Sequence, residues 1–146
     1  TLLTDPELFE TTMELIADWL KDASVDYVAA IEARGFIFGG SLSQKLNCGF
    51  IPIRKPGKLP YKTFREEYSL EYGTDALEIH QDAVRTGQRV FLFDDLLATG
   101  GTALAGAKLL QRCGAEVIKI GFLIELDFLK GKSKLDGFEV QSLIHF

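Results

Sequence analysis

The chain has 146 residues, of which 47% are hydrophobic and 25% are charged, so we expect one globular domain over residues 1–146 with a two- or three-layer core. The net charge of −5 argues against a nucleic-acid or membrane partner, because either would need a basic surface, and a phosphate site must therefore be built locally. Cys48 and Cys113 have no metal-ligand spacing and form no disulfide framework, and no apolar stretch approaches the ~20 residues of a membrane span, so a cytoplasmic protein is expected.

The first predicted element is a helix that begins at Asp5-Pro6-Glu7. Asp is a favourable N-cap, Pro suits the first helical position, and Glu complements the helix dipole in the first turn. An apolar stripe then follows at intervals of four, three and four residues, and consists of Phe9, Met13, Ile16 and Leu20. This face is expected to pack on the core.

Apolar runs then alternate with helical segments. Residues 27–31 and 50–53 are predicted to be buried strands, and residues 36–46, after Arg34-Gly35, to be a helix. Glycine and proline between residues 56 and 60 indicate a loop.

Residues from about 63 to 79 have a different pattern. Tyr68, Leu70 and Tyr72 alternate with polar residues, and a second apolar run follows from Ala76 to Ile79. Alternation of this kind favours strands, so we predict an antiparallel ribbon or flexible flap that turns around Gly73-Thr74-Asp75.

The last third of the chain returns to alternating strands and helices. Strands are predicted over residues 89–93, 117–126 and 140–144, with a helix that ends at Arg112 before Gly114 and a short turn at residues 128–130. Strands that alternate with helices are typical of a parallel, doubly wound α/β sheet.

The most informative stretch is the end of the strand at residue 93 and the turn after it. Asp94 and Asp95 stand where the carboxyl edge of a parallel sheet meets ligands, and suit hydroxyl groups or a metal. The small residues that follow let backbone N–H groups and a helix N-terminus approach an anion, and two threonines add hydroxyl donors. This turn consists of Ala98, Thr99, Gly100, Gly101 and Thr102. The combination predicts a site for a phosphate ester of a polyol.

Two other phosphate-binding motifs do not fit this turn. A Walker loop needs Lys followed by Ser or Thr after its last glycine, whereas Gly101 is followed by Thr102-Ala103. A dinucleotide fingerprint needs differently spaced glycines and no paired carboxylates before them.

Residues 90–102 resemble the phosphoribosyl-pyrophosphate loop of the type I phosphoribosyltransferases. The shared pattern is a hydrophobic strand followed by Asp-Asp, two apolar residues and Ala-Thr-Gly-Gly-Thr. Segments 32–39, 53–60 and 68–73 narrow the resemblance to the adenine phosphoribosyltransferases, and segment 125–135 is similar to their eukaryotic members. The resemblance covers essentially the whole chain. It implies a central parallel sheet flanked by helices, with a flexible antiparallel flap.

The activity implied by the resemblance is the transfer of a phosphoribosyl group from phosphoribosyl pyrophosphate to adenine, which gives AMP and pyrophosphate in purine salvage. The turn from Ala98 to Thr102 would hold the 5′-phosphate, and Asp94 and Asp95 would meet the ribose hydroxyls. Pyrophosphate needs cations, and the loops after predicted strands supply Arg34, Arg54 and Lys58. Lys55 is either a further contact or a solvated neighbour. Magnesium fits as a cofactor, because it binds substrate phosphates and keeps several waters.

The resemblance also assigns catalytic and base-binding residues. Glu71 would be the general acid or base on the flap, and Tyr72 would help to close the flap. The alternation of this segment also permits Glu71 to be an ordinary exposed strand residue. Leu96 and Leu126 match positions that sandwich adenine, although each could equally be a core leucine. His80 and His145 have no carboxylate or cysteine at ligand spacing, so no zinc site is predicted.

Several expectations concern what lies around this site. Family members usually carry an N-terminal segment that helps to cover the base. Either the numbering begins inside a longer protein or this form lacks the segment, and the resemblance favours the first. Gly39-Gly40-Ser41 and Pro60-Tyr61 depart from the family pattern in what are expected to be supporting loops. A homodimer is expected. The alternatives are a phosphoribosyltransferase for xanthine or guanine, and a non-catalytic regulator that binds phosphoribosyl pyrophosphate.

Overall fold

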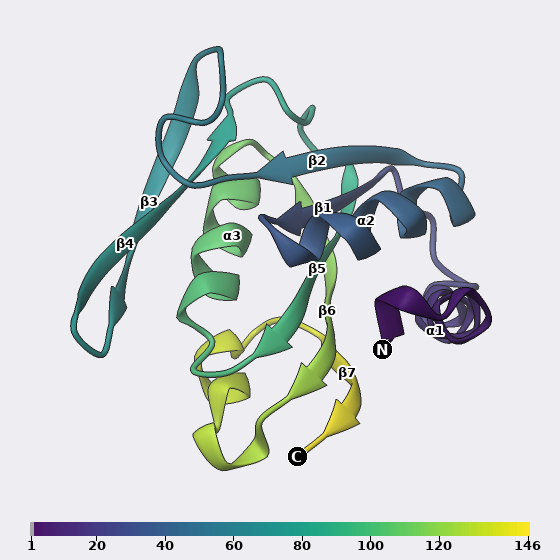
Figure 1. The fold of residues 1–146 in the computed structure, drawn as a ribbon. Coiled ribbons are helices and arrows are strands. Elements are labelled where there is room, and N and C mark those ends of the chain that lie inside the picture. The colour runs from purple at the N-terminus through teal and green to yellow at the C-terminus, as the bar shows by residue number, and fades with distance from the viewer. Residues whose placement is uncertain (1) are drawn as a thin grey trace.

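A five-stranded sheet forms the centre of the molecule in the computed structural model, which describes residues 2–146 (Figure 1). The strand order is β2-β1-β5-β6-β7, and every adjacent pair is parallel. The strands are β1 (Tyr27–Ile31), β2 (Gly49–Ile53), β5 (Arg89–Leu97), β6 (Glu116–Glu125) and β7 (Val140–His145). The predicted parallel α/β sheet is confirmed.

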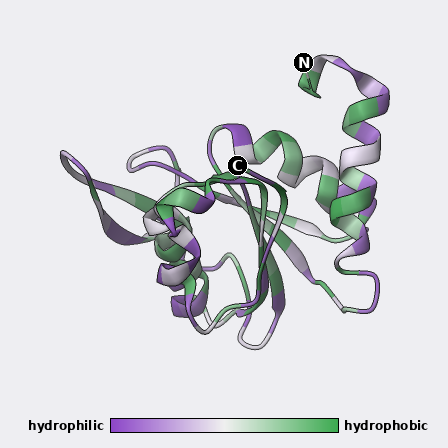
Figure 2. Cartoon of the chain, turned by 90° about the horizontal axis from the view of Figure 1, so that it is seen from below, coloured by the Kyte–Doolittle hydropathy of each residue, from purple (hydrophilic) through white to green (hydrophobic). Residues whose placement is uncertain are grey.

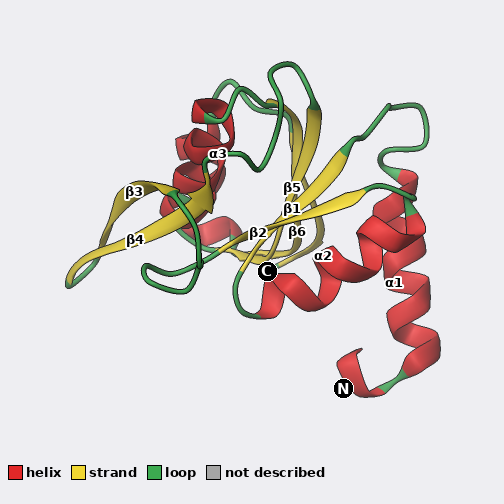
Figure 3. Cartoon of the chain, turned by 90° about the horizontal axis from the view of Figure 1, so that it is seen from above, coloured by secondary structure: helices red, strands yellow, loops and turns green. Residues whose placement is uncertain are grey.

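Helices cover both faces of this sheet (Figure 3). Helices α1 (Pro6–Asp18) and α2 (Arg34–Lys45) lie on one side, and α3 (Gly101–Arg112) lies on the other. Three short 3₁₀ helices complete the chain, at Leu2–Thr4, Asp127–Leu129 and Gly131–Leu135. Within the described residues, no helix combines the length and the apolar character needed to cross a membrane.

Alternate residues of β5 supply the cores of the two layers. Phe91 and Phe93 join the cluster beneath α1 and α2, whereas Val90 and Leu92 join the cluster beneath α3. Successive side chains of a strand point to opposite faces, so this fully apolar run is buried on both sides of the sheet. Hydrophobic colouring accordingly runs along the central strands in Figure 2.

The predicted helix at the N-terminus packs as its pattern indicates. The Asp5 carboxylate accepts a hydrogen bond of 3.0 Å from the Leu8 backbone N–H, which caps α1. Met13, Ile16 and Leu20 are buried, and the Phe9 ring lies 5.7 Å from the ring of Phe38 on α2.

The second helix begins earlier than predicted, at Arg34 instead of Phe36. Gly39 and Gly40 lie inside this helix, so the expectation of a supporting loop there is wrong. A Cβ on Gly39 would lie 2.5 Å from the Cβ of Ala30, and the glycine therefore allows α2 to approach β1 closely.

The remaining strands, β3 (Thr63–Leu70) and β4 (Gly73–His80), form a separate antiparallel hairpin. Its turn lies at Glu71-Tyr72, because Leu70 pairs with Gly73, and the predicted turn at Gly73-Thr74-Asp75 is wrong. The hairpin docks on α3, where the Arg112 guanidinium lies 4.6 Å from the centre of the Phe64 ring and donates a 2.8 Å hydrogen bond to the Arg65 carbonyl.

Candidate active site

The site predicted from the sequence lies where the order of the strands reverses direction. From β1 the chain moves outward to β2, but from β5 it moves the opposite way to β6 and β7. In open parallel sheets the carboxyl ends of the two strands at this point form a crevice for ligands. The helix after β1 begins with Arg34, and the end of β5 carries Asp94 and Asp95.

Arg34 and Asp95 meet across this crevice. The Nε–H of Arg34 donates to Oδ2 of Asp95, and this hydrogen bond and the charge of Asp95 raise the pKa of the Arg34 guanidinium. The Arg34 side chain is 68% exposed, so the pair lies open to solvent at the carboxyl edge. The peptide bond before it, between Glu32 and Ala33, is cis.

Asp94 has a different environment, although it is the neighbour of Asp95. Burial, together with the adjacent charge of Asp95, raises the pKa of the Asp94 carboxyl to about 7, against the effect of a 2.9 Å hydrogen bond from the Asp95 backbone N–H. A Cβ on Gly35 would lie 3.0 Å from Oδ1 of Asp94, so the glycine leaves room for this carboxyl. Asp94 can therefore hold a proton near neutral pH, and the oxygens of both acids can accept hydrogen bonds from a polyol.

β5 continues four residues beyond its predicted end at Phe93, so both acids belong to the strand and not to the turn after it. Leu96 pairs with Ile124 and Leu97 with Glu125, and this pairing with β6 extends the strand.

The predicted phosphate turn joins β5 to α3 through residues 98–100. Gly100 has a φ of +86° and occupies the N-cap of α3, a conformation that glycine adopts without strain. No side chain in the described part of the chain caps this helix, and no hydrogen bond engages the hydroxyls of Thr99 and Thr102 there. Free N–H groups at a helix N-terminus attract anions.

A hollow of about 70 Å³ lies at this turn. Its lining residues come from the end of β5, the turn and the first residues of α3: Asp94, Leu96, Leu97, Ala98, Thr99, Gly100, Thr102 and Ala103. The Asp94 carboxyl group and the uncapped turn thus open into one space.

The turn is supported from behind by Gly131, which the sequence analysis did not single out. A Cβ on Gly100 would overlap the carbonyl oxygen of Gly131, and a Cβ on Gly131 would overlap the carbonyl oxygen of Ala98. The backbones of the turn and of the 3₁₀ helix Gly131–Leu135 therefore pack directly against each other. The only local signal was a glycine between two lysines.

The basic loop after β2 is held by an acid that the sequence analysis gave no role. Glu32 accepts hydrogen bonds from Nη2 of Arg54 at 3.1 Å and from the Lys55 backbone N–H at 2.6 Å. Burial acts to raise the pKa of Glu32, but these bonds and the charges of Arg54 and Lys58 lower it overall. Arg54 also exchanges two backbone hydrogen bonds with Glu78 of β4, so the loop is tied to the hairpin.

The three predicted pyrophosphate cations and Lys55 differ in their partners. Lys55 Nζ donates to Asp75 of β4 and, at 2.7 Å, to the hydroxyl of Tyr68 on β3. Lys58 is exposed, and its carbonyl accepts a 3.4 Å hydrogen bond from Nη1 of Arg54. Lys55 is therefore partly exposed but not free, because it is bound to both strands of the hairpin.

Glu71 and Tyr72 lie at the exposed turn of the hairpin. Tyr72 is 93% exposed, and in the described part of the chain no hydrogen bond or ion pair engages either side chain. The carbonyl oxygen of Ser69 nevertheless lies 3.7 Å from the position of a Cβ on Gly101, so β3 ends beside the start of α3. Glu71 follows Ser69 by two residues and is placed on the phosphate-turn side of the molecule.

Leu96 and Leu126 both lie at the carboxyl edge of β5 and β6. The Leu126 N–H donates a 3.0 Å hydrogen bond to the carbonyl of Leu97, which continues the pairing of the two strands. Both leucines are half-buried, and neither belongs to the two hydrophobic core clusters of the described residues. Their position favours a surface for a flat apolar ligand over a role in the core.

Comparison with known proteins agrees with this geometry. The phosphoribosyl transferase domain family matches residues 1–141. The adenine phosphoribosyltransferase of Christiangramia forsetii is 53% identical over 145 residues, which is 99% of this chain and 85% of that protein. This chain belongs to the adenine phosphoribosyltransferase family.

Solved structures of the adenine phosphoribosyltransferase family share the fold over nearly the whole chain. The Thermoanaerobacter pseudethanolicus structure has a TM-score of 0.97 at 54% identity, and covers 99% of this chain and 84% of its own. The Saccharomyces cerevisiae adenine phosphoribosyltransferase has a TM-score of 0.93 at 39% identity, with coverage of 97% and 82%. The yeast structure holds adenine and an iminoaltritol bisphosphate.

Proposed function

We propose that this chain transfers the 5-phosphoribosyl group from phosphoribosyl pyrophosphate to adenine, with AMP and pyrophosphate as products, and so serves purine salvage. The observation that carries the proposal is the shared hollow of the uncapped α3 N-terminus and Asp94, with Arg34 paired to Asp95 at the same sheet edge. Membership of the adenine phosphoribosyltransferase family supports adenine as the base.

The sugar phosphate binds at the end of β5. The 5′-phosphate accepts hydrogen bonds from the free N–H groups and hydroxyls of residues 98–102, and the positive end of the α3 dipole adds to the attraction. Asp94 and Asp95 accept hydrogen bonds from the ribose hydroxyls. These contacts fix the anomeric carbon over the crevice between β1 and β5.

The leaving pyrophosphate is bound by cations from the β1 and β2 sides. Arg34 can clamp phosphate oxygens once it leaves Asp95, and Arg54, Lys55 and Lys58 lie on the loop after β2. The oxygen donors of Asp94 and Asp95 suit magnesium, which would be held mainly through substrate phosphates, ribose hydroxyls and water. When bound, magnesium supplies positive charge to the leaving group.

The reacting base lies between the edge of β5 and β6 and the hairpin turn. Leu96 and Leu126 offer apolar contacts to the two faces of adenine, and Glu71 holds or donates a proton at a purine ring nitrogen as the glycosidic bond forms. Closure of the exposed hairpin turn brings Glu71 and Tyr72 over the base and excludes water. We also propose that the enzyme is cytoplasmic and that it is a homodimer. Light scattering coupled to size-exclusion chromatography would test the homodimer.

The decisive experiment is a base-competition assay. The protein is incubated with phosphoribosyl pyrophosphate and magnesium, and adenine, guanine, hypoxanthine and xanthine are offered separately while nucleotide and pyrophosphate are measured. AMP from adenine, with no nucleotide from the other bases, is expected. Product from another base would change the substrate, and binding of phosphoribosyl pyrophosphate with no product from any base would indicate a regulator.

A further inference from the structure

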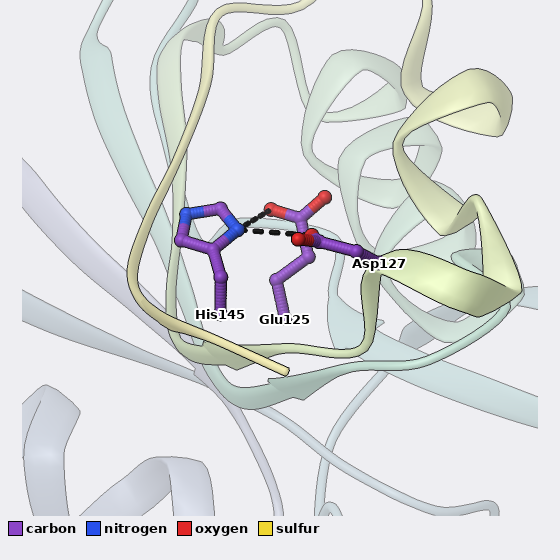
Figure 4. A group of neighbouring side chains, drawn as sticks. All are labelled: Glu125, Asp127 and His145. Carbon is purple, nitrogen blue, oxygen red and sulfur yellow. Dashed lines mark hydrogen bonds and ion pairs between the residues drawn. The ribbon is translucent and has the colours of Figure 1, made fainter.

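A second polar cluster lies at the carboxyl ends of β6 and β7, outside the phosphate turn and the acids of β5. Glu125 ends β6 and His145 ends β7, and the two residues are partners in the parallel register of these strands. Asp127 follows Glu125 by two residues. Figure 4 shows the imidazole of His145 facing both carboxylates.

The three side chains converge on a small volume. Nδ1 of His145 lies 2.9 Å from Oδ1 of Asp127 and 3.8 Å from Oε2 of Glu125. One donor atom from each residue lies within 4.8 Å of the other two. Backbone hydrogen bonds of 2.9 Å from Asp127 to Phe146 and of 3.0 Å from Phe146 to Glu125 hold the two strand ends in this arrangement.

Glu125 makes this cluster different from a set of surface acids. The residue is only 6% exposed, yet no Lys or Arg of the described chain lies within ion-pair distance of it. Its Oε2 accepts a 2.6 Å hydrogen bond from the Ser142 hydroxyl, whereas its Oε1 has no hydrogen-bond partner among the described residues. Oε1 of Glu125 is therefore available to a further ligand, and it lies beside the donor atoms of Asp127 and His145.

We propose that Glu125, Asp127 and His145 form a site for a borderline divalent cation of the zinc class, separate from the magnesium of the nucleotide site. Zinc bonds of about 2.0–2.2 Å place tetrahedral ligands roughly 3.4 Å apart, between the 2.9 and 3.8 Å separations of this cluster. The site is empty.

The donor set also determines which cation is preferred. An imidazole with two carboxylates suits zinc, cobalt or nickel, whereas magnesium prefers oxygen ligands only. Ser142 is positioned to orient the Glu125 carboxylate, as an outer-shell group does for a metal ligand. A cation bound here connects His145 at the end of β7 with Glu125 and Asp127, the two neighbours of Leu126 in the chain. It therefore stiffens the edge of the sheet at which adenine is proposed to bind.

The test is calorimetric titration of the thiol-reduced protein, with zinc in one sample and with cobalt in another. The buffer contains excess magnesium and no substrate. One saturable site per chain is expected, and cobalt binding should produce a visible absorption band. His145→Gln and Asp127→Asn should each weaken binding by at least tenfold, and Ser142→Ala by about tenfold. Asp136→Asn is the matched control, because this exposed acid lies outside the cluster.

Circular dichroism melts without metal establish that each variant is folded, so a loss of affinity can be assigned to the ligand that was removed. Absence of a saturable site, or unchanged affinity in both His145→Gln and Asp127→Asn, would overturn the proposal. Binding that survives those changes would lie at another site, and Cys→Ser variants would show whether Cys48 or Cys113 provides it. The titration requires no turnover, so its outcome is independent of the transferase activity.

Discussion

Arg34 and Asp95 form an ion pair between the first residue of α2 and the end of β5, although they lie 61 positions apart in the chain. Each is proposed to contact a different part of phosphoribosyl pyrophosphate, Arg34 the pyrophosphate and Asp95 the ribose. In the free protein they neutralise each other. Phosphoribosyl pyrophosphate must therefore break the Arg34–Asp95 ion pair in order to bind both residues.

Asp94→Asn combined with Asp95→Asn should weaken binding of phosphoribosyl pyrophosphate and lower turnover, while the fold is kept. Two lost hydrogen bonds to charged groups correspond to about 3 kcal/mol or more of binding free energy. Exposed ion pairs contribute little to stability, so at about pH 4, where the folded parent keeps the Asp94 proton, the melting temperature should stay near that of the parent. Calorimetric titration and thermal melts measure both quantities. Undiminished turnover in the double variant would remove these acids from the site.

The raised pKa of Asp94 predicts a specific pH dependence of stability. Between about pH 4 and pH 7 the unfolded chain has lost the Asp94 proton, but the folded chain keeps it. The unfolded state therefore binds fewer protons, and the contribution of Asp94 to the free energy of unfolding falls as pH rises through this window. Each unit by which the folded pKa of Asp94 exceeds its unfolded pKa corresponds to about 1.4 kcal/mol of the free energy of unfolding.

Asp94→Asn removes this titration. Denaturant unfolding of both proteins at pH 4, 6 and 8 should show that the variant gains stability relative to the parent as pH rises. A stability difference that stays constant with pH would mean that Asp94 ionises at its ordinary pKa.

Glu71→Gln should lower kcat more than it raises KM for adenine. The side chain has no partner in the described part of the chain, so its replacement leaves the fold intact, and a general acid or base contributes about 10²–10⁴-fold to rate. Steady-state kinetics with the matched variant Glu67→Gln, an exposed acid on the same hairpin, provide the control. A change confined to KM, with kcat preserved, would point to binding without proton transfer.

Gly131→Ala should damage the phosphate turn although Gly131 itself is not proposed to contact substrate. The added methyl group overlaps the Ala98 carbonyl, and overpacking of this kind costs about 1–3 kcal/mol of stability. Affinity for phosphoribosyl pyrophosphate should fall together with the melting temperature. Gly40→Ala is the matched control, because Gly40 is exposed within α2 and nothing lies within 4 Å of its Cβ position, and it should be neutral or stabilising by up to about 1 kcal/mol. Equal behaviour of the two variants would refute direct packing of Gly131 on the turn.

Asp75→Asn should loosen the hairpin from the basic loop. Lys55 holds Asp75 and Tyr68 together, and these contacts lower the pKa of Asp75 and connect β3, β4 and the loop after β2. Faster backbone hydrogen exchange in β3 and β4 is expected, with no change in α1. Because the pair is partly exposed, the global stability should change by less than about 1 kcal/mol. Unchanged exchange in the hairpin would show that the Lys55–Asp75 contact is not needed beside the Arg54–Glu78 backbone bridge and the docking on α3.

The sequence alone determined the features that depend on residues close together in the chain. The apolar run of β5, the two acids and the glycine turn are contiguous, so strand, ligand edge and anion site could be read in order. Capping by Asp5 and the apolar stripe of α1 were equally local. The start of α2 and the hairpin turn were misplaced by about two residues, because tertiary pairing, and not turn propensity, decides where these elements begin and end.

Only the tertiary structure decided which distant residues meet. The Arg34–Asp95 pair depends on β1 lying beside β5, and Gly131 reaches the phosphate turn only because the segment after β6 folds back on it. His145 had no ligand partner at any sequence spacing, yet the register of β6 and β7 places it opposite Glu125. Local sequence sets the conformation of each segment, whereas strand order and register, which follow from burial of both sheet faces, set the contacts between segments.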